Sequence, residues 1–223
     1  MLENVMKFIF ATIPVAILMR LLYSKGKGFM LPLKGVKWSF IWGMLITIVI
    51  GICITPIKPE SRTVFNILWT SAFPEELIKF ITMLILINRY NCTSKIDTLV
   101  VCGSVGLGFA YLENIMYIIP HDSYWVMLSI MRALSSIPAH FSYAIFMGYF
   151  IYRAFNKILT PKQKLFSLSI AFILPTLIHW FKNALIKLTE GTLEKIAMYI
   201  PIILLIIAFK IIQKARLEAI EGQ

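Results

Sequence analysis

Charged residues are scarce in this sequence, and acidic residues are the scarcer kind. Only 15% of its 223 residues are charged, with 11 Asp and Glu against 22 Lys and Arg, whereas soluble domains carry about 25%. Hydrophobic residues make up 59% of the chain, and the mean hydropathy is +0.80. This composition leaves no room for a soluble domain and predicts a single all-α polytopic membrane helix bundle over 1–223.

Cysteine pairs and the common signatures of hydrolases are also missing. Cys53, Cys92 and Cys102 are an odd number and widely spaced, without a CxxC pair, so neither a zinc ribbon nor a disulfide framework is expected. GxSxG and HExxH do not occur, and the apolar stretches hold no paired aspartates. The sequence therefore does not indicate a serine hydrolase, an aspartyl protease or a zinc peptidase of the HExxH type.

Long apolar stretches recur along the chain, and a helix needs about 20 apolar residues to cross a bilayer. We expect seven spans: 5–23, 38–57, 64–88, 96–119, 124–152, 165–186 and 196–213. The first is expected to be retained, because no A-x-A-like cleavage site follows its apolar run. The fifth is too long for one crossing and contains Arg132. If Arg132 reaches the outer interface, residues 121–131 lie along the membrane surface.

Basic residues gather on one side of this predicted topology. Thirteen Lys and Arg lie in the first, third and fifth connections and at the C-terminal end, against five on the other side. The positive-inside rule then places the N-terminus outside and the C-terminus in the cytoplasm. The net charge of +11 thus reflects insertion in a lipid bilayer, and no nucleic-acid partner is expected.

Ionisable side chains nevertheless occur inside four consecutive spans, where a charge at the bilayer centre costs about 2.5–3.5 kcal/mol on insertion scales. In chain order they and their amide neighbours are Glu75, Glu76 and Lys79, then Glu113 and Asn114, then His140, then His179, Lys182 and Asn183. Lys79 can reach either glutamate along one helix. A structural ion pair between helices, or a hydrogen-bonded core histidine, would explain each group taken alone.

Residues that break helices lie beside three of these groups. Pro74 precedes Glu75, Pro138 lies two residues before His140, and Pro175 lies four before His179. A proline inside a membrane helix frees a carbonyl that protein or water must satisfy. We therefore expect a bent, hydrated cavity in which the four groups meet, between the midplane and the outer face.

Peptide hydrolysis in a bilayer needs an admitted water, a base and positive charge for the oxyanion. Without an evident Ser or Cys nucleophile, the sequence favours water activated by Glu75 or Glu76. His140 and His179 would bind the oxyanion or protonate the amine. The alternative is a zinc site, in which His140, His179 and Glu113 would form a His₂Glu ligand set and a glutamate would remain as base.

The order of four short motifs carries a family resemblance. EExxK (Glu75, Glu76, Lys79), FAxxEN (Phe109, Ala110, Glu113, Asn114), the lone His140 and HxxxN (His179, Asn183) follow one another on successive spans. This order resembles the PrsW family of bacterial intramembrane proteases over about half the chain. The related CAAX prenyl-protein proteases have EExxxR, FxxxH and HxxxN. Here Lys79 replaces an Arg one position later and Ser136 stands where their Phe would be, which favours PrsW.

The resemblance implies a multi-pass protease of the bacterial cell membrane that acts in a stress response. Its substrate would be a single-pass anti-sigma factor, cut at site 1 on the extracytoplasmic side. A second, rhomboid-independent protease would then complete the release of an extracytoplasmic-function sigma factor. The candidate catalytic residues, in a core expected at 64–186, are Glu75, Glu76, Glu113, His140 and His179, with Lys79, Asn114 and Asn183 in support.

Other classes of membrane protein also carry polar residues in their spans. Ion- or proton-coupled transporters use relays of Glu, His and Lys, but this chain shows no repeated half with matching broken helices. A scaffold or receptor would use the same residues as contacts between helices. In that case Glu75→Gln would lower stability and leave any pathway output unchanged.

Overall fold

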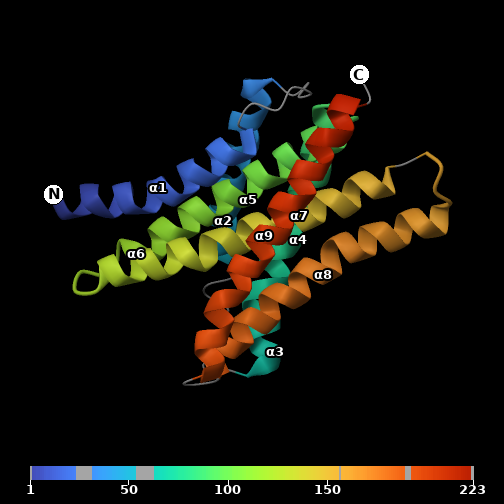
Figure 1. The fold of residues 1–223 in the computed structure, drawn as a ribbon. Helices are drawn as coiled ribbons and strands as arrows, with labels where there is room; N and C mark the ends of the chain where they lie inside the picture. The colour runs from blue at the N-terminus through green and yellow to red at the C-terminus, as the bar shows by residue number, and fades with distance from the viewer. Residues whose placement is uncertain (1, 24–31, 54–62, 156, 189–191, 222–223) are drawn as a thin grey trace.

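The computed structural model describes residues 2–23, 32–53, 63–155, 157–188 and 192–221, which form helices without a strand among them (Figure 1). The elements are α1 (Leu2–Tyr23), α2 (Leu33–Cys53), α3 (Val64–Ile67), the π-helical turn η2 (Leu68–Ala72), α4 (Phe73–Arg89), α5 (Lys95–Ile118), α6 (Trp125–Leu134), α7 (Ser136–Ala154), α8 (Pro161–Leu188) and α9 (Thr192–Glu221). The last residues of the predicted span 38–57 lie outside the described residues.

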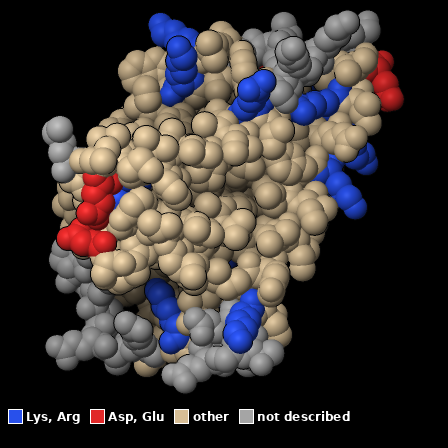
Figure 2. All heavy atoms as spheres, turned by 60° about the vertical axis from the view of Figure 1, so that its left-hand side comes forward, with Lys and Arg blue, Asp and Glu red and all other residues tan. Residues whose placement is uncertain are grey.

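Five helices are long and apolar enough to cross a membrane by length and composition: α1, α2, α5, α8 and residues 195–221 of α9. Large apolar side chains such as Ile13, Ile48 and Ile203 are exposed on these helices, where a soluble protein would carry polar ones. Figure 2 shows a broad belt of uncharged side chains with Lys and Arg mostly toward its two edges. The predicted all-helical, multi-pass membrane bundle is confirmed.

Pro74 determines how the predicted third span is built. α3, η2 and α4 follow one another without a break over Val64–Arg89, in agreement with the span 64–88. A proline cannot donate to the carbonyl four residues earlier and clashes with it. The chain widens just ahead of Pro74 into the π-helical turn, in which the Phe73 N–H bonds to the Leu68 carbonyl, five residues back. Such turns are frequent at functional sites.

The predicted fifth span, 124–152, is two helices rather than one. α6 ends at Leu134, Ser135 intervenes, and α7 begins at Ser136. Pro138 then lies in the first turn of α7, where its missing N–H has no partner to lose. By contrast, Pro175 lies inside α8, which continues past it. The hydrated cavity expected from these prolines stays a prediction.

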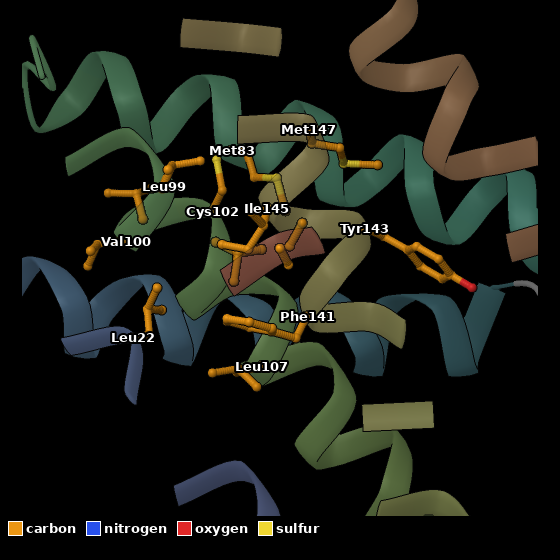
Figure 3. Close-up of a cluster of buried hydrophobic side chains, with 14 of the residues drawn as sticks. Leu22, Met83, Leu99, Val100, Cys102, Leu107, Phe141, Tyr143, Ile145 and Met147 are labelled. Atoms are coloured by element: carbon orange, nitrogen blue, oxygen red, sulfur yellow. The ribbon is translucent and has the colours of Figure 1, made fainter. Parts of the chain in front are cut away.

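α5 is the central helix of the bundle and packs against α1, α2, α4, α7 and α9 (Figure 1). Figure 3 shows Leu99, Cys102 and Leu107 of α5 facing Phe141 and Ile145 of α7 in the apolar core. Every residue of α5 from Ile96 to Ala110 is buried, as expected for a helix that is apolar all round.

Glycines bring α2 and α5 into direct backbone contact. A Cβ on Gly43 would overlap the Val105 carbonyl, and a Cβ on Gly108 would overlap the Phe40 carbonyl. At the same crossing the Thr47 hydroxyl donates to the Phe109 carbonyl at 3.3 Å. Small residues at helix crossings allow this close packing in membranes.

Gly108→Ala is expected to lower the free energy of unfolding by about 1–3 kcal/mol, the usual cost of overpacking, because backbone atoms of α2 cannot move aside without shifting the helix. Gly51→Ala is the matched control on α2, since its Cβ would meet only the flexible end of Met116 at 3.0 Å. Thermal unfolding in detergent, followed by circular dichroism, measures both variants. Equal stability of the two would contradict the proposed backbone contact.

Candidate functional site

The polar residues that the sequence distributes over four spans lie together inside the bundle. α4 contributes Glu75, Glu76 and Lys79, α5 contributes Glu113 and Asn114, α7 contributes His140, and α8 contributes His179 and Asn183. Most of these side chains are buried, and Glu76 is fully so at 0% exposure. The π-helical turn and the Ser135 break lie directly ahead of the α4 and α7 residues.

Glu76 is the centre of the cluster. Its Oε1 accepts hydrogen bonds from Lys79 Nζ at 2.5 Å and from His179 Nδ1 at 2.7 Å. Because the carboxylate only accepts, His179 carries its proton on Nδ1. Glu76 thereby links α4 to α8.

Lys79 links the same carboxylate to α7. Its Nζ lies 3.0 Å from His140 Nδ1 and 4.3 Å from the centroid of the Phe109 ring, a cation–π contact. An ammonium group can only donate, so His140 Nδ1 accepts and its proton lies on Nε2. Lys79 therefore fixes the tautomer of one histidine while it pairs with Glu76.

Glu75 lies beside this pair with more freedom. Its Oε1 accepts from the Ser71 hydroxyl at 3.3 Å, and its Oε2 lies 3.9 Å from His179 Nε2 without a hydrogen-bond partner. It is 9% exposed, against 0% for Glu76. Both glutamates keep one buried oxygen without a hydrogen-bond partner, but Glu76 forms the ion pair with Lys79, so Glu75 is the less strongly bound of the two.

Asn183 completes a hydrogen-bonded ring around His179. Its Nδ2 donates to His179 Nε2 at 3.0 Å and to the Ser71 hydroxyl at 3.1 Å. The Tyr143 ring stacks on His179 at 5.3 Å between centroids, and the imidazole of His140 meets that of His179 edge-on at 5.1 Å. The two histidines are therefore held from several sides.

Glu113 has a different set of partners. Its Oε2 accepts from Arg132 at 2.6 Å and from the Ser136 hydroxyl at 3.1 Å, and it lies 3.2 Å from His140 Nε2. Arg132 also donates through Nε to Asn114 Oδ1 at 2.7 Å. The expectation that Arg132 reaches outward to the interface is wrong, because its side chain is only 12% exposed and pairs inward.

Sequence reasoning missed Ser71, Arg132, Ser136 and Tyr143 as members of this site. Ser71 lies four residues before Glu75, and Arg132, Ser136 and His140 recur at intervals of four, a spacing that aligns side chains on one helical face. That spacing could have indicated three of them. Nothing in the sequence distinguishes Tyr143 from the other tyrosines.

A metal ion fits the donor atoms of four of these residues. Glu75, Glu76, His140 and His179 each offer a ligand atom within 4.8 Å of the others, and one oxygen of each glutamate is buried without a hydrogen-bond partner. Imidazole nitrogens and carboxylate oxygens are ligands that zinc takes. Glu113, the expected third ligand, is not in this group. An ion bound to Glu76 Oε1 and His140 Nδ1 would have to displace the Lys79 ammonium.

Comparisons with known proteins agree on one family. A family model described as "PrsW family intramembrane metalloprotease" matches residues 31–210. The chain is similar to Protease PrsW of Clostridioides difficile, at 28% identity over 77% of this chain and 75% of that protein. It is also similar to Protease PrsW of Bacillus subtilis, at 29% identity over 66% of this chain and 67% of that protein. Protease PrsW of Oceanobacillus iheyensis is 32% identical over 52% of each chain, so this alignment spans about half of either protein. No solved structure shows a significant match.

Lys79→Met is expected to lower the free energy of unfolding by about 3–5 kcal/mol, the usual cost of leaving one charge of a buried pair without its partner. The double variant Lys79→Met with Glu76→Gln should regain most of this loss, because the unpaired carboxylate is gone. Chemical unfolding in detergent micelles measures all three proteins.

Lys37→Met, at an exposed position on α2, is the control and should change stability little. A double variant no more stable than Lys79→Met would refute the proposed dependence of Glu76 on Lys79.

Proposed function

We propose that this chain, which belongs to the PrsW family of intramembrane metalloproteases, hydrolyses a peptide bond in a membrane-anchored protein. The observation that supports this most directly is the buried group of two glutamates and two histidines. It combines a carboxylate that has a free oxygen with imidazoles, inside a bundle whose surface is apolar. Those are the groups that water activation and oxyanion stabilisation require.

The family match confirms the resemblance that the order of motifs indicated. It also confirms the predicted class of membrane-embedded peptidase and the multi-pass location. A match to a peptidase family favours hydrolysis over ion-coupled transport as the task of the buried carboxylates.

Glu75 is the base in the reaction that we propose. Its Oε2 has no hydrogen-bond partner and, unlike Glu76, it forms no ion pair with Lys79, so it can receive a proton from a water that attacks the scissile carbonyl carbon. The carboxyl group then returns this proton to the leaving amine as the C–N bond breaks, which restores the carboxylate. Glu76, which already accepts from Lys79 and His179, orients these groups instead.

His140 and His179 bind the developing oxyanion, and the Lys79 ammonium, 3.0 Å from His140 Nδ1, supplies positive charge beside them. Their imidazoles lie at 5.1 Å between centroids and are held in defined tautomers by Glu76, Lys79 and Asn183. Where a zinc ion is bound, His140, His179 and a glutamate of the group would hold it, and it would supply Lewis-acid charge to that oxygen. The proposal includes the alternative in which Glu113, rather than a glutamate of α4, is the carboxylate ligand.

The substrate that we propose is a single-pass anti-sigma factor, cut at site 1 on its extracytoplasmic side to activate an extracytoplasmic-function sigma factor. Seven crossings would be formed by α1, α2, the continuous segment 64–89, α5, α7, α8 and α9, with α6 near the outer surface. The catalytic core would be 64–186. In this orientation the N-terminus lies outside and the C-terminus in the cytoplasm, in keeping with the basic excess on that side.

The protease assay uses purified full-length protein in detergent with a single-pass anti-sigma factor. Glu75→Gln is expected to lower the rate of cleavage at least about 10²-fold, the lower end of what general base catalysis contributes, while the protein stays folded by size exclusion. Glu221→Gln, at an exposed carboxylate near the end of α9, is the matched control and should cleave at the wild-type rate.

The same assay tests the metal. Loss of cleavage with a zinc chelator and its return on addition of zinc would support a bound ion, whereas activity that withstands the chelator would favour the metal-free form of the site. Cleavage by Glu75→Gln at the wild-type rate would refute the proposed base. Absence of any cleavage by wild type would count against the substrate class.

A green fluorescent protein fused after residue 223 is expected to fluoresce in cells, because it folds only when it stays in the cytoplasm. An alkaline phosphatase fused at the same point should be inactive there, since it matures only after export. The reversed pattern would overturn the proposed orientation. Fusions in the loop that joins α7 to α8, which is also expected in the cytoplasm, should give the same result as the C-terminal fusions.

A further inference from the structure

Arg132 joins three helices through one partly buried side chain. From α6 it donates to Glu113 at 2.6 Å and to Asn114 at 2.7 Å on α5, and to the Ser136 hydroxyl at 3.1 Å on α7. The face of the Tyr117 ring lies 4.1 Å from the centre of the guanidinium. Nε serves Asn114, and one terminal nitrogen serves both Glu113 and Ser136, because the planar guanidinium offers its donors in a fixed fork.

The path from Arg132 into the cluster runs through Glu113. The same oxygen that accepts from Arg132 lies 3.2 Å from His140 Nε2. Since Lys79 donates to the other nitrogen, Nδ1, the proton on Nε2 points at Glu113. His140 is therefore held between a donor on one side and a carboxylate on the other.

We propose that Arg132 is a positioning residue for the reaction. It fixes the carboxylate of Glu113, and Glu113 in turn acts on Nε2 together with Lys79 on Nδ1 to fix the ring orientation and the tautomer of His140, so that Nδ1 faces Glu76 and Lys79. This inference rests on the proposed protease function for its effect on rate. The contact chain itself, from α6 to His140, is a property of the fold.

Both the charge and the shape of the Arg132 guanidinium contribute to the positioning of Glu113. Without Arg132 the carboxylate of Glu113 would lose its closest cationic contact, and a carboxylate in an apolar bundle is costly when it is not paired. It would then turn toward another donor and release His140. A lysine would keep the charge but could not reproduce the separate contacts of Nε and the terminal nitrogen.

A double-mutant cycle tests whether Arg132 acts through Glu113. Arg132→Gln is expected to lower kcat roughly 10–100-fold, the range found when an outer-shell partner of a metal-ligating histidine is removed, with KM within about twofold. Arg132→Lys should recover part of this loss. The double variant Arg132→Gln with Glu113→Gln should be no slower than Glu113→Gln alone, because the second change removes what the first acts on.

Losses that multiply in the double variant would overturn the proposal, since they would mean that the two residues act independently. A loss confined to KM would overturn it as well. Arg153→Gln, at an exposed arginine in the last turn of α7, is the control and should leave kcat unchanged.

A second readout does not depend on activity. The chain has three histidines, so protein labelled with ¹⁵N only at histidine gives few signals in detergent micelles. In wild type, His140 should show a neutral ring protonated at Nε2. Arg132→Gln and Glu113→Gln should change its nitrogen shifts in the same way, while His121, in the connection between α5 and α6, serves as reference.

Unchanged His140 signals in Arg132→Gln would refute the positioning role. A change of equal size at His121 would also refute it, because it would mean that α6 as a whole had come loose. Shifted His140 signals in a protein that cleaves no anti-sigma factor would uphold the contact chain and overturn the proposed substrate instead.

Discussion

The buried pair of Glu76 and Lys79 is the interaction on which the rest of this bundle depends. A carboxylate with no exposure among apolar helices is stable only with a cation and further donors. Lys79 supplies the positive charge from the same helix at 2.5 Å, and both side chains can form further hydrogen bonds. Glu76 uses it to bind His179, and Lys79 uses it to bind His140. One ion pair within α4 thus draws in α7 and α8.

The backbone is adapted to deliver these groups to one place. The π-helical turn before Pro74 and the break at Ser135 each precede a site-bearing helix, and both occur where a proline could not continue a regular α-helix. On the far side of α5, Gly43 and Gly108 bring α2 into backbone contact. α5 is thereby held rigidly while it presents Glu113 and Asn114. The irregular backbone segments therefore lie beside the polar cluster, and the close packing of regular helices lies between α2 and α5.

Much of the fold and part of the site could be predicted from the sequence. Hydropathy gave the helical spans, and the spacing of Glu75, Glu76 and Lys79 predicted an ion pair along one helix. The division of 124–152 at Ser135 was less accessible, because α6 and α7 are both apolar. Arg132 shows why this mattered. From the sequence it was expected to extend toward water, but on the separate helix α6 it pairs with Glu113.

By itself the sequence determined that the protein is a membrane helix bundle and which polar residues must find partners inside it, since apolar length and spacing along one helix are local properties. Only the tertiary structure decided which partner each residue takes. Lys79 pairs with Glu76 rather than Glu75, Arg132 binds Glu113, and Glu113 lies outside the group of four potential ligands. These pairings depend on the rotation and depth of each helix relative to its neighbours, which packing between helices sets.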